Sequence, residues 1–142
     1  MYLKCLHLEN LKCFENLNIT FHPRLTVLVG ANGGGKTTYL RAIGQNLLLF
    51  LCGAPVFASS ASIYPFRHPE TVFADSCDGD VIRERLSEIL PDSFLLLNEI
   101  YSSLDEERGL AYALDCAARL SRAGSFGLFV THFYGVRQSG LP

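Results

Sequence analysis

Residues 30–37 read GANGGGKT, which fits the pattern of a phosphate-binding loop: a glycine, four residues, and then Gly-Lys-Thr. The run before it, Leu25 to Val29, is short, apolar and rich in β-branched residues, which predicts a buried strand. The residues after it, Thr38 to Leu51, contain no proline and can continue as a helix. A glycine-rich turn with a chance lysine is the alternative, but these flanks favour nucleotide binding.

Each residue type in this loop has a physical reason to be there. Glycines let consecutive backbone N–H groups turn inward around a phosphate without Cβ clashes. The following helix begins at the loop, so its free N–H groups and positive dipole end face the phosphates. Lys36 supplies a positive charge to the β- and γ-phosphates, and the Thr37 hydroxyl can bind Mg²⁺. The residues expected to contact the nucleotide are Gly30, Ala31, Asn32, Gly33, Gly34, Gly35, Lys36, Thr37 and Thr38.

Length and composition indicate a single domain in a cytoplasmic setting. A chain of 142 residues with 49% apolar content can bury one core. The net charge of −2, without a long Lys/Arg run, argues against strong nucleic-acid binding by this domain alone. Its 5 scattered cysteines suit reduced thiols better than disulfides or a zinc site. Residues 1–20 carry charges unlike a signal peptide, and the apolar run 47–52 is too short to span a bilayer, so we expect no membrane partner.

The rest of the pattern predicts an α/β fold. We expect a single compact domain over residues 1–142: an antiparallel strand pair in 1–23, a nucleotide-binding core in 24–135 and a tail in 136–142. Within the core, helices are predicted at 81–90 and 104–120, and the irregular stretch 56–80 is expected to hold a short strand or two. Alternating strands and helices indicate a mainly parallel sheet flanked by helices.

Two further apolar strands end in polar residues. The run 94–97 leads directly into Asn98-Glu99, and the run 126–130 leads into Thr131-His132. Ligands of parallel α/β sheets bind at the carboxyl ends of the strands. We therefore expect both polar pairs to meet the phosphate-binding loop at one edge of the sheet.

An apolar strand that ends in an acidic pair resembles the part of P-loop NTPases that holds the Mg²⁺ shell and the attacking water. By this resemblance Glu99 is the candidate general base, because the water must lose a proton as it attacks the γ-phosphate. An ordinary surface carboxylate is the alternative. By the same resemblance, Thr37 and Asn98 are the candidate Mg²⁺ ligands, although Asn98 stands where the family has Asp. Since an amide carries no charge, we expect weaker Mg²⁺ binding and slower turnover.

The segment EIYSSLD, Glu99 to Asp105, has the spacing of Glu-Pro-Thr-Ser-x-Leu-Asp in ABC-type ATPases. This resemblance implies that Ser103 and Asp105 belong to the D-loop, which crosses a head-to-tail dimer interface in that family. Asp105 can equally be an acid favoured at a helix N-terminus. His132 resembles the switch histidine that contacts the γ-phosphate, although a lone histidine is also compatible with a structural role.

The resemblance narrows to the ATPase domain of MutS-like DNA mismatch-repair proteins. Asn32 and the run GGKTTYLR at 34–41 are similar to that family's Asn-Met-Gly-Gly-Lys-Ser-Thr-Tyr-Leu-Arg. Glu99-Ile100, then GLA at 109–111 and FVTHF at 129–133, follow in the family's order. The start of the chain, with ENLKCF at 9–14, instead resembles RecF/SMC-type ATPases, so the branch stays open. No Leu-Ser-Gly-Gly-Gln signature occurs, and its nearest stand-in, Ser76, is better explained as part of a solvated loop.

The resemblance implies ATP and Mg²⁺ as cofactors, and ATP hydrolysis coupled to a conformational switch in DNA repair or maintenance. It also implies an ATP-dependent head-to-tail homodimer, or pairing with a related subunit, that contacts DNA only through other domains or partners. Asn98 and the missing signature favour an alternative, a catalytically weak nucleotide-dependent interaction module. A small-molecule kinase is a third hypothesis, but it would need an arginine-bearing lid and has no need of Glu99 or His132.

Overall fold

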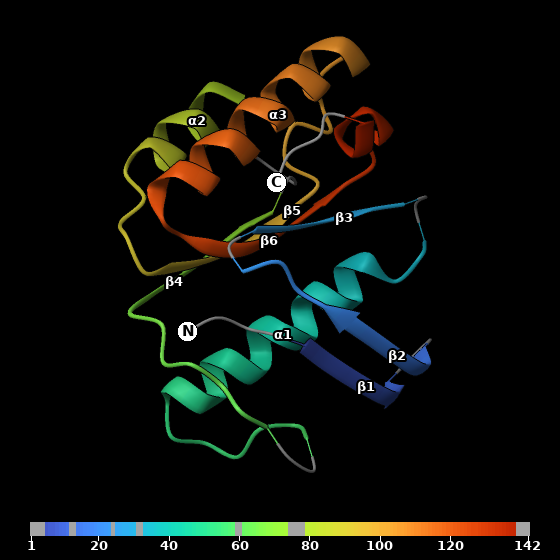
Figure 1. Cartoon of the computed structure of the whole chain (residues 1–142), viewed down its shortest axis with the longest axis vertical. Helices are drawn as coiled ribbons and strands as arrows, with labels where there is room; N and C mark the ends of the chain where they lie inside the picture. Colours follow the sequence, from blue (N-terminus) through green and yellow to red (C-terminus); the bar gives the residue numbers. More distant parts are fainter. Residues whose placement is uncertain are drawn as a thin grey trace.

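The computed structural model describes residues 5–11, 14–23, 25–30, 33–58, 61–73 and 79–138. After an initial strand pair, strands and helices alternate along the chain (Figure 1). The elements are β1 Cys5–Leu11, β2 Phe14–Thr20, β3 Leu25–Val29, α1 Lys36–Leu51, β4 His68–Phe73, α2 Gly79–Ser87, β5 Ser93–Asn98, α3 Glu106–Ala123, β6 Phe126–Thr131 and the 3₁₀ helix η2 Tyr134–Gln138.

The main sheet is parallel and carries helices on both faces. Its strands lie in the order β3-β6-β5-β4, while β1 and β2 form a separate antiparallel pair. Figure 1 shows α1 and this strand pair on one side of the sheet, and α2 and α3 on the other. The predicted fold class is therefore confirmed, and β4 is a short strand within the stretch predicted to be irregular.

Strand β5 shows why the inner strands of the sheet are largely apolar. Its residues 93–97 are all buried, as an inner strand of a sheet covered on both faces requires. Leu95 and Leu97 pack in the cluster beneath α2 and α3, and Phe94 and Leu96 pack in the cluster around α1. Burial of such a side chain stabilises a fold by roughly 1.5–3 kcal/mol. Strand β5 is thus held rigidly just before Asn98.

The helix ends differ slightly from the predicted ones. The helix predicted from 104 begins at Glu106, because Asp105 caps it: the Asp105 carboxylate accepts a hydrogen bond of 3.0 Å from the Arg108 N–H. The helix ends at Ala123 instead of 120 and is followed by Gly124, whose φ is 71°. Helix α2 covers Gly79–Ser87 rather than 81–90, and the Ser87 hydroxyl donates to the Glu84 carbonyl in its last turn.

None of the helices in the described ranges has the length and apolar character needed to cross a membrane.

The chain beyond β6 takes part in the core as far as Val136, the first residue of the expected tail. Val136 in η2 is buried in the cluster beneath α3, so the expected tail, 136–142, begins inside this short helix. The helix η2 also contacts β3, the strand that leads into the phosphate-binding loop.

The cysteines allow a direct test of the packing. Cys116 on α3 is 2% exposed, and burial raises the pKa of its thiol to about 12, whereas Cys5 and Cys52 are exposed. Alkylation requires an accessible thiolate, so iodoacetamide at neutral pH is expected to modify Cys5 and Cys52 in the native protein and to spare Cys116. Mass spectrometry of the digested protein measures this. Equal labelling of Cys116 and Cys52 without denaturant would contradict the packing of α3.

Candidate functional site

The strand order brings the predicted polar residues to one edge of the sheet. β6 lies between β3 and β5, with Val29 paired to Thr131 and Asn98 paired to Val130. All three strands are parallel, so their carboxyl ends point the same way. The phosphate-binding loop, Asn98-Glu99 and the segment from Thr131 therefore lie next to one another, as the sequence predicts.

The loop itself has the backbone conformation of a glycine-dependent turn. Gly33 and Gly35 have φ angles of 81° and 77°, which residues with a Cβ rarely adopt. Helix α1 starts immediately afterwards at Lys36, with no acidic residue in its first turn. Its first N–H groups and positive dipole end are thus available for an anion. Thr38 lies half-buried in this first turn, whereas Ala31 and Asn32 lie outside the described residues.

Lys36 links the loop to the end of β5. Its ammonium group donates a hydrogen bond of 2.6 Å to the Gly30 carbonyl and lies 4.0 Å from the Glu99 carboxylate. The Lys36 side chain is only 11% exposed, against 26% for Glu99. The positive charge is therefore held in the loop, beside the carboxylate that follows β5.

Thr37 and Asn98 form the second link between the loop and β5. The Thr37 hydroxyl donates a hydrogen bond of 3.0 Å to the Asn98 side-chain carbonyl, although the residues are 61 positions apart. Two uncharged oxygens thus meet beside the loop. Oxygen ligands suit Mg²⁺, which also keeps water and phosphate oxygens in its shell. No group of at least three His, Cys, Asp or Glu able to bind a metal is found among the described residues.

Glu99 has an unusual backbone conformation. Its φ is 49°, and that of Tyr101 is 70°, although neither residue is glycine. Such angles cost about 1–3 kcal/mol each and persist where the surroundings enforce them. Here the Glu99 N–H donates to the Val130 carbonyl at 2.8 Å, and the Tyr101 ring is buried against Tyr112. The turn is therefore held at both residues, and the Glu99 carboxylate lies beside the Lys36 ammonium group.

His132 follows β6 and is half-buried, with its ring 4.3 Å from that of Phe133. The Phe133 ring packs on Gly109 of α3, where a Cβ would come within 2.3 Å of it. A glycine is therefore needed at position 109 for this close approach. The arrangement ties the segment carrying His132 to α3.

The proposed D-loop residues lie between β5 and α3. Ser103 and Asp105 are both exposed, and the Asp105 carboxylate caps α3 as described above. The predicted helix-terminal role of Asp105 is thus present in the structure, and this exposed position leaves a role at an interface open. Ser76, the stand-in for the missing signature, lies outside the described residues.

Beside the loop is a cavity of about 430 Å³ that the sequence did not indicate. Apolar side chains of β2 and β3, including Ile19, Val27 and Val29, line it together with Lys36. Arg137 of η2 also lines it. The sequence contains no motif around Arg137, and only the packing of η2 against β3 brings it to this place.

Comparisons with known proteins agree with this architecture. The family model of the AAA domain matches residues 5–52. The chain is 30% identical over 122 residues to the "Endonuclease MutS2" of Anaeromyxobacter sp., which covers 77% of this chain and 15% of that protein. The same protein of Borreliella burgdorferi is 28% identical over 136 residues, covering 84% of this chain and 17% of the relative. That of Solidesulfovibrio magneticus is 28% identical over 141 residues, covering 89% and 18%.

The chain therefore spans less than a fifth of the length of these curated relatives. The matches confirm the resemblance to a MutS-like ATPase domain with the fold of a P-loop NTPase.

Proposed function

We propose that this chain, through its resemblance to MutS-like ATPase domains, binds ATP with Mg²⁺ and hydrolyses it to drive a conformational switch in DNA repair or maintenance. The observation that carries the proposal is the meeting of Lys36, the Thr37–Asn98 pair and Glu99 beside the phosphate-binding loop. Phosphate binding, metal binding and water activation are the three tasks that such a site has to combine.

The binding chemistry follows from the loop. The backbone N–H groups of residues 33–36 and the positive end of α1 would hold the phosphate oxygens. The Lys36 ammonium group, now bonded to the Gly30 carbonyl, would reach the β- and γ-phosphates. Thr37 and Asn98 would hold Mg²⁺, which neutralises the charge of the phosphates when it is bound.

The hydrolytic step would use Glu99 as general base. A water oxygen attacks the γ-phosphorus, Glu99 accepts the proton of that water, and the bond to the bridging oxygen of ADP breaks. His132, which directly follows β6, would contact the γ-phosphate and hold it in position. The left-handed backbone at Glu99 supports this role, because strained conformations cluster at functional sites.

Phosphate release by the wild-type protein tests the hydrolytic part of the proposal. Inorganic phosphate that accumulates from ATP, depends on Mg²⁺ and grows in proportion to protein concentration is the expected result. ATP binding without phosphate release would instead support a second function, a nucleotide-dependent interaction module. The uncharged Asn98 beside Thr37 is the observation that favours this second function.

Replacing Asn98 with aspartate tests how the missing charge affects the site. Asn98→Asp keeps an oxygen within reach of the Thr37 hydroxyl and adds a negative charge near the bound ion. We expect the Mg²⁺ concentration for half-maximal phosphate release to fall about tenfold, equivalent to about 1.4 kcal/mol of added attraction. A Mg²⁺ titration of the initial rate measures this. An unchanged titration curve would show that Asn98 does not contribute to ion binding.

The assembly and its setting extend the same proposal. Ser103 and Asp105 are exposed and would contribute to an ATP-dependent head-to-tail dimer, with a second copy or a related subunit. The curated relatives are named as endonucleases and are several times longer, so DNA would be contacted through other domains or partners. A cytoplasmic location suits an ATPase of this kind.

A further inference from the structure

The cavity beside the phosphate-binding loop has cationic side chains and no anionic ones. Of the described residues that line its volume of about 430 Å³, Lys36 and Arg137 are charged and none is acidic. A volume of this size is typical of sites for small ligands. The charge pattern therefore suits an anionic ligand beside β3.

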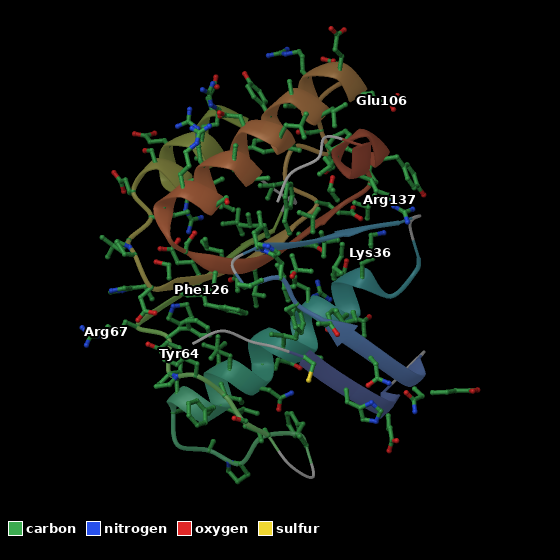
Figure 2. All side chains as sticks on the ribbon, in the orientation of Figure 1. Lys36, Tyr64, Arg67, Glu106, Phe126 and Arg137 are labelled. Atoms are coloured by element: carbon green, nitrogen blue, oxygen red, sulfur yellow. The ribbon has the colours of Figure 1, made fainter. Side chains whose placement is uncertain are left out.

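Arg137 comes from a part of the chain that the proposed site does not otherwise use. Figure 2 shows Arg137 and Lys36 on the same side of the molecule, near the end of β3 that leads into the loop. The guanidinium group belongs to an exposed residue, and the ion pairs within the described ranges do not include it. It is thus available to bind a ligand in the cavity.

The backbone around Arg137 is nevertheless firmly placed. Its neighbour Val136 is 5% exposed and packs in the core beneath α3, and the Val136 N–H donates to the Phe133 carbonyl at 3.2 Å. Gly135 fits against Leu110 so closely that a Cβ there would lie 2.5 Å from the leucine side chain. An arginine on an anchored turn loses little backbone freedom when it binds a ligand.

We propose that Arg137 is a second cationic contact of the bound nucleotide and donates hydrogen bonds to oxygens of its phosphate chain. The inference rests on the proposed function, because the same cavity must accept the nucleotide held by Lys36. Arginine presents several N–H donors in a planar fork that matches phosphate oxygens. Because η2 follows the segment that carries His132, this contact also links nucleotide binding to that segment.

Nucleotide affinity of Arg137→Ala tests the inference. One charge-assisted hydrogen bond at a partly exposed position corresponds to an affinity loss of about tenfold. We expect Arg137→Ala to lose this much affinity for ATP in the presence of Mg²⁺, and Arg137→Lys to lose less. Both losses of affinity should become smaller as the salt concentration is raised. Arg67→Ala is the matched control, since Arg67 is also exposed and lies on the opposite side of the view in Figure 2.

Competition by inorganic tripolyphosphate against a fluorescent ATP analogue shows which part of the nucleotide is contacted. A similar loss for tripolyphosphate and ATP supports the contact with phosphates. A loss that appears for ATP and not for tripolyphosphate would overturn it. If Arg137→Ala binds ATP as the wild type does while Lys36→Ala does not, the inference fails and the proposed function stands. If the wild-type protein binds no ATP, both fail.

Discussion

Glu99→Gln is expected to reduce phosphate release by at least about 100-fold, the lower end of what a general base contributes. Glutamine keeps the size and shape of the side chain but cannot accept the proton of the attacking water. The backbone is expected to stay in place, because the Glu99 N–H still donates to the Val130 carbonyl. Initial rates at saturating ATP and Mg²⁺ measure the effect.

The affinity of Glu99→Gln for ATP separates catalysis from binding. The carboxylate lies 4.0 Å from the Lys36 ammonium group and adds negative charge where phosphates would sit. Its removal is therefore expected to leave ATP binding as tight as in the wild type or tighter. A variant that hydrolyses ATP at the wild-type rate would exclude Glu99 as the general base.

Lys36→Ala is expected to weaken ATP binding by about 10- to 100-fold, because it removes a largely buried charge-assisted contact with the phosphates. The side chain is only 11% exposed, so solvent screens its charge weakly. Fluorescence or calorimetric titration with ATP measures the loss. Phosphate release at low ATP concentration should fall in parallel.

Arg122→Ala serves as a control for Lys36→Ala, because it removes a positive charge from an exposed position at the far end of α3. Its affinity for ATP is expected to match the wild type. Equal losses in the two variants would show that net charge, and not the position of Lys36, determines nucleotide affinity.

Much of the sheet could be predicted from the sequence because its inner strands, β5 and β6, are buried on both faces. The runs at 94–97 and 126–130 are apolar throughout and stop where polar residues begin. The run at 25–29 is apolar except for Thr26 and stops at the phosphate-binding loop, so the three ends mark the edge that carries the site. Two glycines mark the ends of helices: Gly35 directly precedes α1, and Gly124 directly follows α3. Both have left-handed backbones, which favour glycine.

Other features depend on contacts between distant segments and have no local pattern. Tyr101 and Glu99 adopt left-handed backbones that non-glycine residues rarely show. Tyr101 is buried, and the Glu99 N–H donates to the Val130 carbonyl, a contact between segments far apart in the sequence. The predicted helix from 104 begins later, because the Asp105 side chain caps it. Arg137 reaches the cavity through the packing of η2 on β3, which no spacing along the chain indicates.

Calorimetric titration of the wild-type protein with ATP in the presence of Mg²⁺ is the most direct test of a nucleotide site at residues 30–37. Saturable, equimolar binding with a Kd between about 1 μM and 1 mM is expected, the usual range for enzyme substrates. The same titration with Lys36→Ala should show the loss described above. The absence of saturable heat from the folded wild-type protein up to several times the top of that range would contradict the assignment of this loop as a nucleotide site.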